Sequence, residues 1–263
     1  MIIIGIFANA IEEFRKYIIE NYDPKDGMIS LKIRHTYGVV DASEYIAKSL
    51  GLDNENIQLA RTIALLHDIG RFEQAKQYKD YRDYKNIDHA ELGVKILFEE
   101  GLIRKFIQDD KYDNVILKVI KNHNKLEIED GLNEEELLHA KIIRDADKTD
   151  NFRVKVEEKF EDISNLTREE LENSNITDKI YNDFMNNKLI IISERKEPLD
   201  FWISYIAFIF DYNFTVGLKY IYDENYINIM IDRLDYKKDE VKEKMNKIRK
   251  HAIEYVDNKI NNK

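Results

Sequence analysis

The sequence predicts an all-α protein built as a helical bundle. Only nine glycines and two prolines, Pro24 and Pro198, occur among the 263 residues, and so few turn-forming residues favour long helices over many short strands. Apolar residues recur at helical spacing through most of the chain, without an internal repeat or a low-complexity linker. A hydrophobic content of 43% is enough for a sizeable core. We therefore expect one large domain, or a domain with an extension.

Start and stop signals define the first three helices. We expect a first helix over residues 11–21, ended by Pro24, and a second over residues 30–50, ended by Gly51. The third should begin after Asp53, because this side chain can accept hydrogen bonds from the free N–H groups at a helix start. The inward residues of the second and third helices are His35, Val39, Ala42, Ile46 and Leu50, then Ile57, Ala60, Ala64 and His67.

A polar segment and two further helices follow. Residues 72–87 are rich in Tyr, Lys and Asp, and we expect them to form a loop over the end of the third helix. Residues 89–100 and 113–125 should form the fourth and fifth helices. Both helices carry a histidine on their apolar face, His89 on the fourth and His123 on the fifth.

Two later helices are opened by pairs that resemble capping boxes, in which two residues satisfy each other's free N–H groups. The pairs are Asn133 with Glu136 and Thr167 with Glu170. The helix that follows the first pair turns Asp147 inward at helical spacing.

The C-terminal part is expected to be helical as well. Residues 198–222 are strongly aromatic and predict one helix that is apolar almost all round, and residues 239–259 predict a last long helix. We expect a metal-binding helical core over residues 1–160 and a helical extension over residues 161–263 packed on it. A homodimer is compatible with the sequence.

Composition excludes several classes of function. The net charge of −10 argues against binding to a nucleic acid polymer, and no window approaches the apolar length of a membrane span. The absence of cysteine excludes disulfides, thiolate metal sites and cysteine nucleophiles. Without a basic leader at the start, a signal peptide is not expected, and we expect a cytoplasmic protein.

Histidine and aspartate side chains recur on or beside the apolar helical stripes. A single histidine on such a stripe is usually a hydrogen-bonded core residue, and we interpret His139 and His251 in this way. The same interpretation would have to hold four more times, and it would leave two aspartates at the ends of apolar runs, where an uncompensated carboxylate is costly. One metal cluster explains all six remaining residues: His35, His67, Asp68, His89, His123 and Asp147.

Two ions fit this ligand set. Asp68 has two carboxylate oxygens and could bridge two ions. His35, His67 and Asp147 would complete the first site, and His89 and His123 would lie on the second. Four imidazoles with two carboxylates suit a divalent transition metal, manganese or iron above all, with magnesium, nickel, cobalt or zinc also compatible. One ion or two remain open at this point.

These residues resemble a known family. The order His35, His67-Asp68, Asp147 is similar to the HD superfamily of metal-dependent phosphohydrolases, and the resemblance covers residues 34–151. It includes the contexts Ala-Leu-Leu-His-Asp-Ile-Gly-Arg at residues 64–71 and Arg-Asp-Ala-Asp-Lys-Thr-Asp at residues 144–150. The resemblance implies an all-helical HD-type bundle. Histidines at positions 89 and 123 are similar to the two-metal branch, although many of its members carry two adjacent histidines where this chain has His123-Asn124.

The resemblance also implies roles and a function. Arg71 and Lys148 are candidates to contact substrate phosphate, the alternative for both being a surface or structural cation. Gln74 is a weaker substrate-binding candidate, and Asp68 could serve as a proton acceptor. We expect hydrolysis of a phosphate ester or anhydride of a small phosphorylated substrate, a nucleotide being favoured. Two alternatives remain: a di-iron HD-type oxygenase, which would consume O₂, and a non-catalytic nucleotide-sensing protein.

Overall fold

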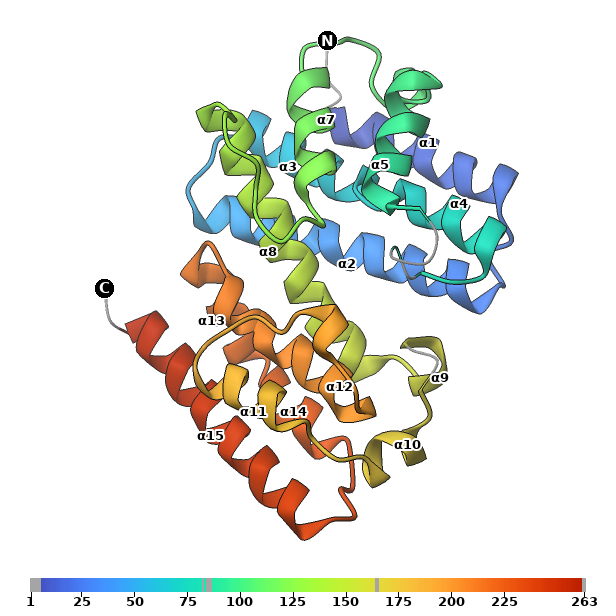
Figure 1. The fold of residues 1–263 in the computed structure, drawn as a ribbon. Coiled ribbons are helices and arrows are strands. Elements are labelled where there is room, and N and C mark those ends of the chain that lie inside the picture. Colours follow the sequence, from blue (N-terminus) through green and yellow to red (C-terminus); the bar gives the residue numbers. More distant parts are fainter. Residues whose placement is uncertain (1–5, 82, 84–86, 164–165, 262–263) are drawn as a thin grey trace. The chain divides into compact units, whose positions relative to one another are not determined.

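The computed structural model describes residues 6–81, 83, 87–163 and 166–261, and every regular element in these ranges is a helix (Figure 1). The predicted all-α fold is confirmed. The chain divides into two compact units, Met1–Asp147 and Lys148–Lys263, so their boundary falls inside the long helix α8 (Glu134–Glu157). The division at residue 160 that the sequence suggests stays a prediction. None of the helices in the described ranges is both long and apolar enough to cross a membrane.

The first unit is a bundle around α2, α3 and α7. Within it α2 packs against α3, α3 against α1 and α7, and α5 against α4 and α7. Its elements before α8 are α1 (Ile6–Asn21), α2 (Gly27–Ser49), α3 (Asn54–Leu66), α4 (Ile69–Tyr78), α5 (His89–Val94), the π-helical turn η2 (Lys95–Glu99), α6 (Ile103–Phe106) and α7 (Asp113–Asn122).

Side chains at the helix starts explain several of these bounds. Asp53 caps α3 by accepting a hydrogen bond from the backbone N–H of Asn56, as expected. Asn133 and Glu136 form the expected reciprocal pair of hydrogen bonds at the start of α8, both 2.9 Å. Helix α2 begins earlier than expected, because Asp26 accepts hydrogen bonds from the first free N–H groups and caps it.

The expected loop over residues 72–87 is wrong for its first half, which is helical. Helix α4 continues to Tyr78, and Lys79 then ends it in a left-handed conformation. Ile69, Phe72 and Ala75 are all buried and follow one another at three-residue spacing, which matches one helix face. The polar composition of the segment after Phe72 hid this short apolar stripe.

His139 is a buried core residue, as expected. Its ring is 1% exposed, Nε2 lies 3.0 Å from Asn56 Oδ1, and Nδ1 has no hydrogen-bond partner among the described residues. Burial lowers its pKa from 6.5 to about 4, because a proton on Nδ1 would be buried without an acceptor.

This histidine predicts acid sensitivity of the metal-free protein. Between pH 6.5 and about 4 the unfolded chain binds a proton at His139 that the folded chain does not, so stability falls as the pH falls. At about 1.36 kcal/mol per pKa unit, the contribution at pH 5 is a loss of roughly 2 kcal/mol. Urea unfolding at pH 7 and at pH 5 measures this loss. Between the two pH values, His139→Leu should lose roughly 2 kcal/mol less stability than the wild type. The pH 7 comparison controls for lost packing, and an unchanged difference between the two pH values would contradict the assignment.

The second unit has its own apolar core. Trp202 is 1% exposed at its centre, and its indole Nε1 donates to the Met230 carbonyl at 3.1 Å. Thr167 and Glu170 form the predicted capping box at the start of α10. After α8 the elements are α9 (Phe160–Ile163), α10 (Arg168–Asn173), α11 (Asp178–Met185), η3 (Ile192–Glu194), α12 (Pro198–Ile206), η4 (Ala207–Asp211), α13 (Thr215–Asp223), α14 (Tyr226–Asp232) and α15 (Asp239–Asn261).

The single aromatic helix expected over residues 198–222 is wrong. The chain forms α12, a 3₁₀ segment and then α13, with extended backbone at Tyr212. A Cβ on Gly217 would lie 2.5 Å from the Tyr212 ring, so the ring packs directly against the glycine of the next helix. The aromatic residues of this segment have the spacing of a single helix, but they are divided between α12, the 3₁₀ segment and α13.

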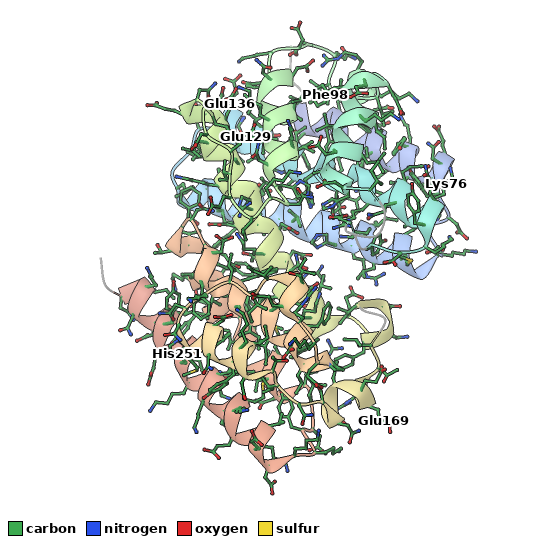
Figure 2. The ribbon with its side chains drawn as sticks, viewed as in Figure 1. Lys76, Phe98, Glu129, Glu136, Glu169 and His251 are labelled. Atoms are coloured by element: carbon green, nitrogen blue, oxygen red, sulfur yellow. The ribbon has the colours of Figure 1, made fainter. Side chains whose placement is uncertain are left out.

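His251 on α15 meets the expectation only in part (Figure 2). Its Nε2 lies 2.8 Å from Asn187 Oδ1, so the ring is hydrogen-bonded. It is half-buried rather than part of the closed core.

Candidate metal centre

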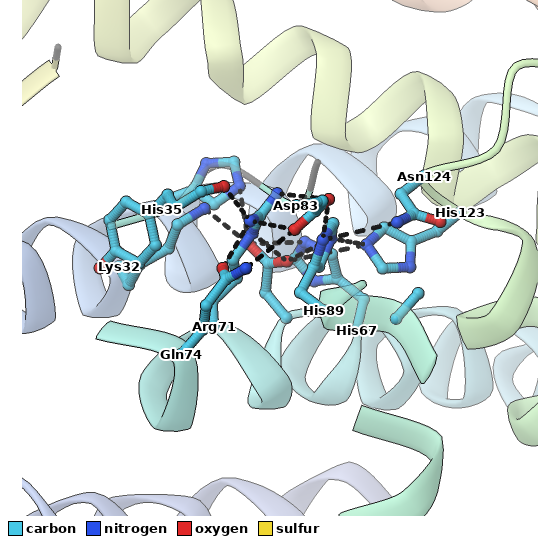
Figure 3. Close-up of polar contacts among 12 residues, drawn as sticks. Lys32, His35, His67, Arg71, Gln74, Asp83, His89, His123 and Asn124 are labelled. Atoms are coloured by element: carbon cyan, nitrogen blue, oxygen red, sulfur yellow. Dashed lines mark hydrogen bonds and ion pairs between the residues drawn. The ribbon is translucent and has the colours of Figure 1, made fainter. Parts of the chain in front are cut away.

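The first unit brings together six polar side chains from six helices or their ends. His35 lies on α2, His67 and Asp68 join α3 to α4, His89 is the first residue of α5, and His123 directly follows α7. Asp147 lies on α8. Figure 3 shows His35 at one end of this group and His123 at the other. The four histidines and Asp68 are all at most 5% exposed.

Asp68 is held at the start of α4 with its carboxylate free to face the histidines. It occupies the cap position of that helix but accepts no capping hydrogen bond. The positive end of the helix dipole nevertheless favours a carboxylate there.

One oxygen of Asp68 faces the first pair of histidines. Oδ2 lies 3.6 Å from Nε2 of His35 and 3.6 Å from Nε2 of His67. His35 Nε2 is also 3.0 Å from Oδ1 of Asp147.

The other oxygen of Asp68 faces the second pair. Oδ1 lies 3.3 Å from Nε2 of His89 and 3.7 Å from Nε2 of His123. The two Nε2 atoms are 2.9 Å apart. The carboxylate thus separates two groups of candidate ligands, each with ligand atoms within 4.8 Å of one another.

The protonation of three rings follows from the acceptors beside Nδ1. His67 Nδ1 lies 2.7 Å from the Ala64 carbonyl, and His123 Nδ1 lies 2.6 Å from the Ile120 carbonyl. His89 Nδ1 lies 2.7 Å from a carboxylate oxygen of Asp83. Each Nδ1 therefore donates, and in a neutral ring each Nε2 carries a lone pair that points into the cluster.

These lone pairs fit a bound cation. His89 and His123 would point two lone pairs at each other across 2.9 Å, which is repulsive unless a positive charge lies beside both. Two nitrogens about 2.1 Å from one ion and at a right angle to each other lie about 3 Å apart. His67 Nε2 is buried and has no hydrogen-bond partner among the described residues. The cluster therefore has the donor set of a divalent metal site.

Comparison with known families agrees with this geometry. Residues 33–151 match the HD domain, and the matched range contains all six clustered residues. The matched region, residues 33–151, is an HD domain. HD domains form a superfamily of metal-dependent phosphohydrolases, so the family and the cluster both imply divalent metal binding. Comparison with curated proteins and with solved structures gives no match.

The electrostatics of the HD site keep the ligands in their binding forms. Burial lowers the pKa of His67 and of His89 to about 4, so both rings are neutral at pH 7. Burial raises the pKa of Asp68, but the charge of Lys32 and the neighbouring imidazoles outweigh it and hold the pKa well below 3.8. Burial likewise opposes the hydrogen bond and charge of His35 at Asp147, and the net pKa is again lowered. Metal ligands must be deprotonated in this way.

Two cations approach the carboxylate of Asp68, one at each oxygen. Lys32 Nζ lies 2.7 Å from Oδ2, and Arg71 Nε lies 3.8 Å from Oδ1. Both cations flank the ring of Tyr81, at 5.3 and 5.8 Å from its centroid. Sequence reasoning missed Lys32, although it lies three residues before His35 and so on the same face of α2.

The other predicted substrate-binding residues have protein partners. Gln74 is fully buried on α4, where it accepts from Arg71 and donates to Asp83 and to the Ile87 carbonyl. Lys148 belongs to the second unit, where its ammonium lies 2.7 Å from Asp211. Their substrate contacts stay predictions.

Asn124 has a structural contact of its own. Its amide donates to Asp88 at 2.9 Å, and Asp88 caps the start of α5. The residue that replaces a second histidine here therefore ties α7 to the helix that begins with His89.

Proposed function

We propose that this chain is a metal-dependent phosphohydrolase that cleaves a phosphate ester or anhydride of a small molecule, a nucleotide above all. The proposal includes a two-ion centre. His35, His67 and Asp147 would hold one ion, His89 and His123 the other, and Asp68 would bridge them. Manganese and iron suit this mixture of imidazole and carboxylate ligands.

One observation carries the proposal. Each oxygen of Asp68 faces two imidazole Nε2 atoms and one cationic side chain, Lys32 at Oδ2 and Arg71 at Oδ1. Cations at this position would face an anionic substrate once the charge of Asp68 is satisfied by bound metal. A phosphoryl group, whose oxygens gain charge during transfer, fits such a site better than a neutral group does.

The bound metal and the neighbouring side chains would have different roles. Bound divalent metal supplies a Lewis acid that lowers the pKa of water and stabilises charge on phosphoryl oxygens. Lys32 and Arg71 bind and orient the phosphate, Lys32 as a point charge and Arg71 through its remaining N–H groups. Asp68 would also serve as proton acceptor, and the apolar residues around the buried histidines would limit access of bulk water.

Phosphate release by the manganese-loaded protein under anaerobic conditions tests the function. Nucleoside mono-, di- and triphosphates and p-nitrophenyl phosphate are suitable substrates. Hydrolysis of at least one class without oxygen is the expected result. Oxygen consumption by the iron-loaded protein without phosphate release would support the oxygenase alternative instead, and metal-dependent nucleotide binding without turnover would support the sensing alternative.

Lys32→Gln is expected to raise the KM for the substrate about 10- to 100-fold, because a charge-assisted hydrogen bond is worth about 1.5–3 kcal/mol. The metal content should stay at the wild-type level, since Lys32 is not a ligand. Lys118→Gln is the matched control: Lys118 pairs with Glu136 at 2.9 Å in the same unit, and its loss should leave KM unchanged. An unchanged KM in Lys32→Gln would remove Lys32 from the substrate site.

A further inference from the structure

The candidate ligand histidines differ in what holds Nδ1. His67 and His123 each donate to the carbonyl three residues earlier, within or at the end of the same helix. His89 is the first residue of α5, so no earlier turn of its own helix can supply a carbonyl. Its acceptor is Oδ2 of Asp83, at 2.7 Å, from the connection between α4 and α5. The orientation of His89 therefore depends on a side chain, whereas His67 and His123 use backbone carbonyls.

Asp83 also holds the cation beside the same half. Its Oδ1 accepts from Arg71 Nη1 at 2.8 Å and from Gln74 Nε2 at 3.0 Å. Arg71 Nη1 also donates to the Tyr81 carbonyl at 2.5 Å. One carboxylate thus joins His89 on α5 to two residues of α4, as Figure 3 shows.

Asn124 is the other described side chain with a contact at this ring nitrogen. Its amide nitrogen lies 3.5 Å from His89 Nδ1 and donates to Asp88. A donor cannot accept the Nδ1 proton. Without Asp83 the ring would lose both its fixed orientation and the tautomer that leaves a lone pair on Nε2.

We propose that Asp83 is a positioning residue that sets the affinity of the second metal position by orienting His89, while its other oxygen holds Arg71. The inference rests on the proposed two-ion centre. A carboxylate beside a metal-bound imidazole raises its basicity more than a carbonyl does, and loss of such a partner typically costs about 10- to 100-fold in metal affinity. We expect the effect at one position, because Asp83 contacts His89, which belongs to one half of the cluster, and the two halves meet at Asp68.

Calorimetric titration of Mn²⁺ into the metal-free protein measures the affinity of each binding step directly. Wild type is expected to bind two ions. Asp83→Asn should weaken one binding step about 10- to 100-fold and leave the other within about threefold. Asp53→Asn is the matched control, because it removes an acid from the same unit at a helix cap where asparagine serves equally well.

Two further variants show which binding step is affected and whether Asp83 acts through His89 or through Arg71. His89→Ala should abolish the step that Asp83→Asn weakens, and Asp83→Asn should add nothing in the His89→Ala background. Arg71→Met removes the other partner of Asp83 and should keep both ions. The proposal is overturned if Asp83→Asn leaves both steps unchanged or weakens both alike, if the two substitutions add independently, if Arg71→Met loses the second ion, or if wild type binds only one ion.

These outcomes do not depend on turnover. A protein that binds two ions with the expected dependence on Asp83 but hydrolyses no phosphorylated substrate would contradict the proposed function and leave the inference standing. A protein that hydrolyses its substrate with unchanged metal affinity in Asp83→Asn would do the reverse.

Discussion

Replacing Asp68 by alanine is expected to remove all bound transition metal and all hydrolysis from the protein. Asp68 contributes an oxygen to each half of the cluster, and both oxygens lie 3.3–3.7 Å from imidazole Nε2 atoms. Without this carboxylate one half would keep His35, His67 and Asp147 and the other only His89 and His123, and the ligand proposed to link the two ions would be lost. The metal content measured by elemental analysis should fall from about two ions per chain towards zero.

The expected loss of activity is at least about 1,000-fold. A metal site contributes several kcal/mol of transition-state stabilisation, and each 1.36 kcal/mol is a factor of ten in rate. Stability gives a second readout. Metal at a hundred times its Kd stabilises the wild type by about 2.7 kcal/mol, and the variant should lose that gain.

His123→Ala and Asp53→Ala make the result specific. His123→Ala removes a ligand from one half only, and the metal content should fall towards one ion. Asp53→Ala removes the cap of α3 and should cost about 1 kcal/mol of stability with both ions retained. If Asp68→Ala still binds two ions, the bridging role is excluded. If His123→Ala loses both, the two halves are not separable.

The fold and the cluster could both be predicted from the sequence for one physical reason. Helical periodicity fixes which residues share a face, so His35, His67, His89 and His123 could be placed inward from spacing alone. The structure brings all of them to Asp68 because each lies on the buried face of its helix or at its end. The ligand assignment itself remains a prediction until metal is measured.

Other parts of the site had no such signal. Asp83 lies in a run of polar residues, and its contact with His89 corresponds to no periodic pattern in the sequence. Lys32 lies on the face of α2 that carries His35, but a lysine on a helix is usually solvated, so nothing in the sequence distinguished it. The break between α12 and α13 depends on the Tyr212 ring lying against Gly217, a contact that aromatic spacing cannot reveal.

Gly70→Ala is expected to destabilise the first unit by about 3 kcal/mol and to weaken the second metal position. Gly70 is the second residue of α4. A methyl group on Gly70 would overlap the backbone carbonyl of His89 and lie 2.8 Å from the backbone nitrogen of Gly93. Both contacts are with backbone, so neither can be relieved by turning a side chain, and α4 and α5 must move apart.

Helix propensity alone would make Gly70→Ala stabilising, which is the opposite of the expected result. Alanine is favoured over glycine in a helix by up to about 1 kcal/mol, so any measured loss is steric and exceeds that gain. Because the displaced group is the backbone of His89, the metal position that depends on His89 should weaken together with stability. Urea unfolding and Mn²⁺ titration of the same samples measure the two effects side by side.

Gly93→Ala is the matched control on the facing helix. Among the described residues the nearest contact of its added methyl would be the Ile69 side chain at 3.5 Å. This is an ordinary contact, and stability should change by less than about 1 kcal/mol. A tolerated Gly70→Ala would show that α4 and α5 can separate without cost, and would contradict the close backbone contact that places His89 beside Asp68. A large loss in Gly70→Ala alone would show that the glycine after the His-Asp pair is required because it lets the two helices meet at the metal centre.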